Sequence, residues 1–138
     1  MLKNINCTDN LKEGRIFNLL LVEDDYANAE FVKIIFRKEN IKIFHVVNGA
    51  DAVDLFNNNP MLDLVLMDIK MPVMDGYIAT QEIRKINTNI PIIAFTAFAL
   101  DGDREKAIEA GCTDYVIKPV NKEKLINMVK LYLAKIDN

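Results

Sequence analysis

Short apolar runs alternate with amphipathic segments along nearly the whole chain, and this alternation limits the possible folds more than any other feature. In the segments between the apolar runs, apolar residues recur at helical spacing. Strands that alternate with helices indicate β-α-β units, hence a parallel sheet that helices cover on both faces. The expected strands are residues 16–22, 41–47, 63–67, 90–95 and 115–117, and the expected helices are residues 26–38, 49–58, a segment through 79–86, 102–110 and 121–136.

Such units predict one α/β domain. Right-handed crossovers leave few topologies, and the natural choice is a flavodoxin-like, doubly wound three-layer sandwich. Its five-stranded parallel sheet would have the order 2-1-3-4-5, with five helices. The 138 residues suit one compact domain, which we assign to residues 16–138. Residues 1–15 are polar without periodicity, and we interpret them as an N-terminal tail or the remnant of a linker.

The composition excludes several classes of protein. Apolar residues make up 51% of the chain, charged residues 27%, and the net charge is −3, which is typical of a globular domain without a basic face for nucleic acid. No apolar stretch approaches the roughly 20 residues of a membrane helix. Cys7 and Cys112 form no metal or redox pattern, so we expect free thiols in a reducing cytoplasm.

Polar residues of reactive type follow four of the five expected strands. In open α/β sheets, sites lie beyond the carboxyl ends of the strands, where the strand order reverses. Each of these residues also has an ordinary structural interpretation. The next acidic residue after the first strand, Asp25, for example, is suited to cap the helix that follows. Four such strand ends at one rim nevertheless predict a site. The residues are Glu23 and Asp24 after the first strand, Asp68 after the third, Thr96 after the fourth and Lys118 after the fifth.

Three carboxylates in one small site repel each other by about 4 kcal/mol per pair at ~4 Å and an effective dielectric of ~20. Either some stay protonated or a cation lies among them. An oxygen-only shell favours Mg²⁺, with Mn²⁺ or Ca²⁺ next. The Lys118 ammonium and the Thr96 hydroxyl suit phosphate oxygens. The combination predicts phosphoryl transfer to a carboxylate.

Four motifs carry a resemblance to a known family. They are "LLLVEDD", "LVLMDIKMPVMDG", "IPIIAFTA" and "GCTDYVIKPV", in that order along the chain. Together they resemble the receiver domain of two-component response regulators, and specifically the receivers that are similar to the chemotaxis regulator. The resemblance covers residues 16–137.

The resemblance implies a role for each matching residue. Asp68 would be the phosphoacceptor, and Thr96 and Lys118 would contact the new phosphoryl group. Tyr115 would be the aromatic switch that turns inward when Thr96 moves. The metal ligands would be Glu23, Asp24, Asp68 and the backbone carbonyl of Lys70; Lys70 and Phe98 would tune the access of hydrolytic water; and Lys118–Pro119 would be a cis peptide.

The resemblance also implies a signalling role. A histidine kinase or a histidine phosphotransfer domain would donate the phosphoryl group. The domain would catalyse its own phosphorylation and slow hydrolysis, without turning over a substrate as an enzyme does. The surface of residues 102–110, 115–117 and 121–136 would then switch and dock a downstream protein. Direct binding to nucleic acid and membrane insertion are not expected, and homodimerisation stays open.

Several alternatives remain at this point. A haloacid-dehalogenase-type phosphatase also uses a strand-end aspartate with Mg²⁺, but it has a second aspartate where this chain has Lys70. A flavodoxin-like binding module would need a phosphate-binding loop after the first strand, where "EDDYANA" is acidic. A receiver that is never phosphorylated would act as a docking module. Within the family, a single-domain regulator and the C-terminal receiver of a hybrid sensor kinase remain equally open.

His45 is the only histidine. It lies inside a strand pattern, whereas a phosphodonor histidine belongs on an exposed helix. We interpret it as a packing or edge residue, so that the phosphodonor must be another molecule or another domain.

Overall fold

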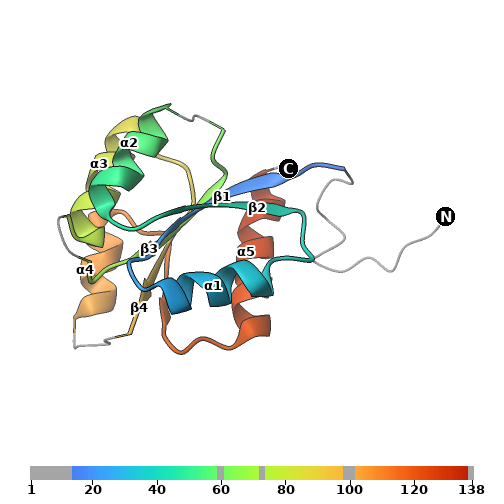
Figure 1. Ribbon diagram of the computed structural model, residues 1–138. Helices are drawn as coiled ribbons and strands as arrows, with labels where there is room; N and C mark the ends of the chain where they lie inside the picture. Colours follow the sequence, from blue (N-terminus) through green and yellow to red (C-terminus); the bar gives the residue numbers. More distant parts are fainter. Residues whose placement is uncertain (1–13, 59–60, 72–73, 98–101, 137–138) are drawn as a thin grey trace.

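The computed structural model describes residues 14–58, 61–71, 74–97 and 102–136. Its five strands form one parallel sheet in the order β2-β1-β3-β4-β5 (Figure 1), which confirms the predicted topology. Each strand lies close to its predicted position. The strands are β1 (Phe17–Val22), β2 (Ile41–Val46), β3 (Leu64–Asp68), β4 (Ile92–Thr96) and β5 (Asp114–Ile117).

Five helices cover the two faces of this sheet. Alternate residues of β1 explain why both faces need cover, since Leu19 and Leu21 pack toward α1 and α5 while Leu20 and Val22 pack toward α2, α3 and α4. None of the helices in the described ranges has the length and apolar composition that crossing a bilayer requires. The helices are α1 (Tyr26–Ile35), α2 (Gly49–Asn58), α3 (Gly76–Ile86), α4 (Asp103–Ala110) and α5 (Lys122–Ile136).

The buried face of α1 differs from the predicted one. The sequence suggested a buried stripe of Ala27, Phe31, Ile34 and Ile35, but of these residues Ile35 alone is buried. The core instead receives a second apolar stripe made of Ala29, Val32 and Ile35. The stripe of Ala27, Phe31 and Ile34 therefore lies on the surface. A smaller difference of the same kind occurs in α3, for which the sequence suggested a buried stripe of Ala79, Ile83 and Ile86: the first two are buried, but Ile86 is exposed.

Two aspartates fix the helices that begin near the expected site. Asp25 caps α1 by accepting a hydrogen bond from the backbone N–H of Asn28, as predicted. Asp75 caps α3 in the same way, through the N–H of Ile78. Together the two caps set where α1 and α3 leave the carboxyl ends of β1 and β3. These two neighbouring strands mark the point where the chain reverses its direction across the sheet.

Gly76 allows α3 to begin directly against the end of β3. Its N–H donates to the carbonyl of Ile69 at 3.0 Å. A Cβ at this position would collide with the backbone carbonyl oxygen of Asp68 and would lie 2.8 Å from the Cα of Ile69. The close approach therefore requires glycine, and it places the first turn of α3 beside the strand end that carries Asp68.

Candidate functional site

A polar cleft of about 180 Å³ lies at the carboxyl ends of β1 and β3. Most of the residues that we predicted from the strand ends line it, and Asp68 reaches it as the last residue of β3. The lining residues are Glu23, Asp24, Asp25, Asn28, Asp68, Lys70, Ala97 and Lys118.

The three predicted carboxylates converge in this cleft. One oxygen from each of Glu23, Asp24 and Asp68 lies within 4.8 Å of the others. Glu23 and Asp68 are buried, whereas Asp24 is exposed at the mouth. A single ion could contact all three groups, and an all-oxygen set of this charge fits a hard divalent cation such as Mg²⁺. The residues present therefore fit the metal that the sequence predicted.

Lys118 supplies the positive charge of the cleft. Its Nζ donates to Oε1 of Glu23 at 2.5 Å and lies 3.7 Å from Oδ2 of Asp68. The same ammonium group lies 4.7 Å from the centre of the Phe95 ring, in a cation–π position. The lysine thus partly neutralises the two buried carboxylates, and it lies where it could also contact a group bound to Asp68.

The environment of Asp68 favours its protonated form. Burial, followed by the hydrogen bond and the negative charge of Glu23, raises the pKa of Asp68 to about 8. Lys118 and the backbone N–H of Lys70, which donates to Oδ1 at 3.1 Å, act in the opposite direction but less strongly. A cation beside Asp68 would restore the ionised form, which is the nucleophilic one.

Thr96 and Tyr115 lie on the neighbouring strand pair. Tyr115 pairs in register with Ala94, and Thr96 pairs with Ile117. Because side chains two residues apart on a strand share a face, Thr96 and Tyr115 belong to the same face of the sheet. Thr96 is buried at the end of β4, and the buried Tyr115 hydroxyl shows that its ring is turned inward. The pair therefore lies on the face that α4 covers, and Thr96 directly precedes Ala97, which lines the cleft.

The remaining predicted residues have different outcomes. The backbone N–H of Lys70 contacts Asp68, so this residue lies in the cleft as expected. The Lys118–Pro119 peptide is cis, which is the configuration that the resemblance implied. Phe98 lies outside the described residues.

Sequence reasoning gave His45 only a packing role at an edge. It does lie on the edge strand β2, but its Nε2 also contacts the backbone carbonyl of Glu23 at 2.8 Å. The ring of Tyr26 meets His45 edge-on, with the two ring centres 5.9 Å apart. His45 thus helps to hold the end of β1 and so the acidic residues that follow it. No signal in the sequence indicated this contact, which depends on the register of β1 and β2.

The fold and the cleft together define a class: a doubly wound α/β domain with an acidic pocket and a lysine at the carboxyl ends of its strands. The sequence profile of the response regulator receiver domain matches residues 19–130. The chain belongs to this family, whose members act in two-component phosphorelay signalling, and which is not usually counted among the enzymes.

Similar proteins include long and short members of the family. The chain is 38% identical over 125 residues to hybrid signal transduction histidine kinase I of Dictyostelium discoideum, covering 85% of this chain but 7% of that protein. It is 32% identical to the polar-differentiation response regulator DivK of Brucella anthropi, covering 85% of this chain and 96% of the relative. The chain therefore spans only a small part of the first relative.

One similar solved structure contains a metal ion in its cleft. The receiver domain of the sensor histidine kinase PA1611 from Pseudomonas aeruginosa has a TM-score of 0.79 and 37% identity with this chain. The alignment covers 86% of this chain and 98% of that domain. That structure has a magnesium ion coordinated in its active-site cleft.

Proposed function

We propose that Asp68 accepts a phosphoryl group from a phosphohistidine. The observation that carries this proposal is the position of its carboxylate, buried at the end of β3 between two further carboxylates and the ammonium group of Lys118. One carboxylate oxygen of Asp68 would attack phosphorus, and the P–N bond to the donor's imidazole would break. The imidazole nitrogen keeps the electron pair and takes up a proton.

Mg²⁺, with Mn²⁺ as an alternative, is the proposed cofactor. Glu23, Asp24, Asp68 and the backbone carbonyl of Lys70 would hold it, and when bound it would offset the negative charge of the phosphoryl oxygens and keep Asp68 ionised. Lys118 would leave Glu23 and pair with the phosphoryl group, since its ammonium already lies 3.7 Å from Asp68.

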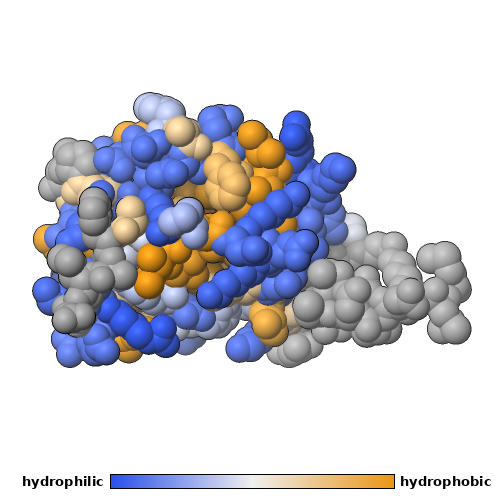
Figure 2. Space-filling view, turned by 90° about the horizontal axis from the view of Figure 1, so that it is seen from below, coloured by the Kyte–Doolittle hydropathy of each residue, from blue (hydrophilic) through white to orange (hydrophobic). Residues whose placement is uncertain are grey.

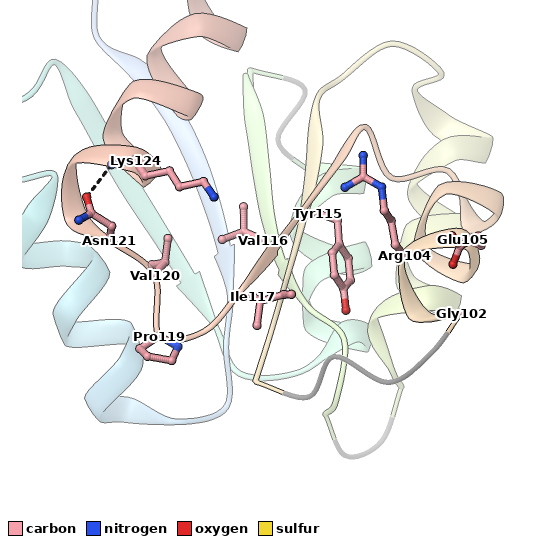
Figure 3. Close-up of a pocket in the computed structure, with 10 residues that line it drawn as sticks. All are labelled: Gly102, Arg104, Glu105, Tyr115, Val116, Ile117, Pro119, Val120, Asn121 and Lys124. Carbon is pink, nitrogen blue, oxygen red and sulfur yellow. Dashed lines mark hydrogen bonds between the residues drawn. The ribbon is translucent and has the colours of Figure 1, made fainter.

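The phosphoryl group adds about two negative charges at neutral pH. Thr96 would move onto this group, and Tyr115, whose ring is already turned inward, would be fixed in that position, which would switch the surface formed by α4, β5 and α5. A hollow of about 660 Å³ lies on this surface, with Tyr115, Ile117 and Pro119 among its lining residues (Figure 3). A downstream protein would dock there, and a second copy of the chain is an alternative occupant.

The phosphodonor would be a histidine kinase or a histidine phosphotransfer domain, and we place the transfer in the cytoplasm. The exposed apolar stripe of α1 supports a protein donor, because Ala27 and Phe31 line a hollow of about 280 Å³ together with Lys118 and Pro119. Figure 2 shows hydrophobic residues surrounded by hydrophilic ones on the side where α1 lies. A protein that covered this hollow would bring its histidine to the cleft.

A substitution at Phe31 distinguishes a protein phosphodonor from a small-molecule phosphodonor. Phe31→Asp should slow transfer from a phosphohistidine protein by about tenfold or more, because it puts a charge into an apolar contact. Phosphorylation by acetyl phosphate should keep its rate. Both rates can be followed by intact mass spectrometry, and an equal loss with both donors would contradict docking on α1.

The experiment that tests the function itself is intact mass spectrometry after incubation with acetyl phosphate, with and without Mg²⁺. We expect one phosphoryl adduct that requires Mg²⁺ and is absent from Asp68→Asn. Absence of an adduct with acetyl phosphate and with a range of phosphohistidine donors would contradict the proposal and leave a docking module. Continuous release of phosphate from an added phosphomonoester would instead indicate the phosphatase alternative.

The lifetime of the adduct tests the two residues that we assign to the control of water. Release requires water to attack phosphorus, which breaks the acyl phosphate P–O bond and frees inorganic phosphate. Lys70 lines the cleft, and we propose that Phe98 keeps water away. Phe98→Glu should shorten the lifetime, and an unchanged lifetime would remove the basis for this role.

The long and the short relatives support two proposals for the kind of protein to which this receiver belongs. In one, the chain is the receiver of a hybrid sensor kinase, as its similarity to histidine kinase I suggests. In the other, it is a single-domain regulator, as its similarity to DivK suggests. The division into a tail at residues 1–15 and a receiver at residues 16–138 also remains a proposal.

A further inference from the structure

A buried carboxylate lies on α4, outside the acidic cleft. Asp103 is the first residue of α4 and is only 4% exposed. The other buried residues of this helix, Ala107 and Ala110, are small. Two alanines bury little apolar surface, so apolar burial by the residues of this helix contributes little to its attachment. A buried carboxylate is also costly unless polar partners accompany it.

Two tyrosine hydroxyls share the region of Asp103. Tyr77 comes from the first turn of α3 and Tyr115 from β5, and both rings pack against the core beneath α4. Both hydroxyls are buried, and among the residues that the structure describes neither has a partner at hydrogen-bond geometry. A buried hydroxyl without a hydrogen bond is unfavourable, so a small movement that brings each one to an acceptor is favourable.

The buried side of α4, which carries Asp103 and Ala107, packs on the same core as the two tyrosines. Burial and then the negative charge of Asp103 raise the pKa of Tyr77 to about 12. Burial and then the charges of Asp103 and Glu105 raise the pKa of Tyr115. Figure 3 shows Tyr115 beside the first turn of α4, and the residues on either side of Asp103, Gly102 and Arg104, line the same hollow as Tyr115.

We propose that Asp103 is a positioning residue for the switch, whose carboxylate holds the Tyr115 hydroxyl inward and couples that position to α4. Tyr77 anchors the carboxylate from α3. The inward position of Tyr115 is then favoured before phosphorylation, and the phosphoryl group on Asp68 has less to overcome when it draws Thr96 and Tyr115 into place. This inference rests on the proposed function, because it gives the Tyr115 switch a partner.

An ordinary alternative is that Asp103 only favours the N-terminus of α4 as a negative charge near a helix dipole. Glu105 lies in the same first turn and is exposed, so it provides that interaction without burial. The dipole alone therefore does not account for a carboxylate that is buried beside two hydroxyls. It also makes Glu105→Gln a matched control, since this variant removes the same charge from the same helix turn.

The first measurement needs no phosphorylation. Ring-¹³C-labelled tyrosine gives NMR signals for Tyr26, Tyr77, Tyr115 and Tyr132, and a soluble paramagnetic agent reports the exposure of each ring. We expect Tyr115 to be protected in the wild type and in Glu105→Gln, exposed in Asp103→Ala, and intermediate in Asp103→Asn, because the amide oxygen still accepts a hydrogen bond. Equal protection of Tyr115 in all four proteins would overturn the inference.

The second measurement is the affinity for beryllofluoride, a phosphoryl mimic, in the presence of Mg²⁺. Asp103→Ala should weaken it roughly tenfold, in line with the loss of a hydrogen bond to a charged group. In a Tyr115→Phe background the same change should have little further effect, because the hydroxyl that Asp103 holds is already gone. An equal effect in both backgrounds would overturn the coupling.

Controls separate the possible failures. Tyr132 lies on α5 and its hydroxyl donates to Asp114 at 2.8 Å, so an unchanged Tyr132 signal shows that a variant is folded. If Asp103→Ala does not fold, Asp103→Asn and Tyr77→Phe replace it in the test. In each of them the Tyr115 ring should be more exposed than in the wild type, by less than is expected for Asp103→Ala. If the wild type does not bind beryllofluoride, the proposed function fails, and the NMR measurement still decides the role of Asp103.

Discussion

At the scale of single residues, the ammonium group of Lys118 balances the negative charge of the cleft. Glu23 has no exposed surface, and its carboxylate accepts a hydrogen bond from Lys118. A buried charge without a partner costs several kcal/mol, whereas the pair itself contributes little net stability. We infer that the lysine substitutes for a cation at Glu23 and is released when one binds.

This interpretation predicts the behaviour of Lys118→Met. In the presence of EDTA, the free energy of unfolding should fall by about 3 kcal/mol, because Glu23 loses its partner. Saturating Mg²⁺ should stabilise the variant more than it stabilises the wild type, since it returns positive charge to the site. Urea unfolding measures both effects.

The matched control is Lys33→Met, which removes an exposed ion pair with Glu30 on α1. Its cost should stay below about 1 kcal/mol, with no dependence on Mg²⁺. If Lys118→Met were equally mild in EDTA, Lys118 would not be the counter-charge of Glu23.

At the scale of elements, α1 shows where periodicity is insufficient. The helix carries two apolar stripes, Ala27–Phe31–Ile34 and Ala29–Val32–Ile35, and both have helical spacing. Periodicity identifies the helix but cannot decide which stripe faces the sheet, because that depends on where the Asp25 cap starts the first turn. Ala27 and Phe31 of the stripe that remains outside line a hollow beside Lys118, which is where we propose that a phosphodonor protein docks.

The close contact between the start of α3 and the end of β3, which Gly76 allows, directly affects the position of Asp68. Gly76→Ala should destabilise the domain by about 1–3 kcal/mol, because the added Cβ meets the backbone of Asp68 and Ile69. Movement of the strand end should also weaken Mg²⁺ binding, measured by calorimetry.

Gly49→Ala is the matched control for this substitution. Gly49 is the first residue of α2, and its added Cβ would lie 2.6 Å from the backbone carbonyl oxygen of Met74, which precedes α3, so a similar loss of stability is expected. Its affinity for Mg²⁺ should remain that of the wild type. A loss of affinity in both variants would show that general destabilisation, and not the position of Asp68, weakens binding.

At the scale of the whole molecule, the sequence was sufficient for the topology and for the residues that meet in the cleft. Buried parallel strands have a strong apolar signature, and a parallel sheet brings all carboxyl ends to one rim. Two features that depend on packing between distant elements were not predictable. The bond from His45 to Glu23 depends on strand register, and the burial of Asp103 depends on how α4 packs. In the sequence, Asp103 is indistinguishable from an exposed first-turn acid.

The raised pKa of Asp68 links the cleft to the stability of the whole fold. An unfolded chain releases this proton near pH 3.8, whereas the metal-free folded chain retains it up to about pH 8. Between these values the folded state binds more protons than the unfolded state. The free energy of unfolding should therefore be greatest below pH 3.8 as far as Asp68 is concerned, and it should fall as the pH rises toward 8.

The expected slope for this group is up to about 1.4 kcal/mol per pH unit within that window. Asp68→Asn cannot release a proton, so the difference between the wild type and this variant in EDTA isolates the contribution of Asp68 from that of every other titrating group. Urea unfolding at several pH values gives that difference. Equal slopes would mean that Asp68 is already ionised in the metal-free cleft. The Mg²⁺ that we propose would compete with the proton at Asp68, so its stabilising effect should grow over the same pH range.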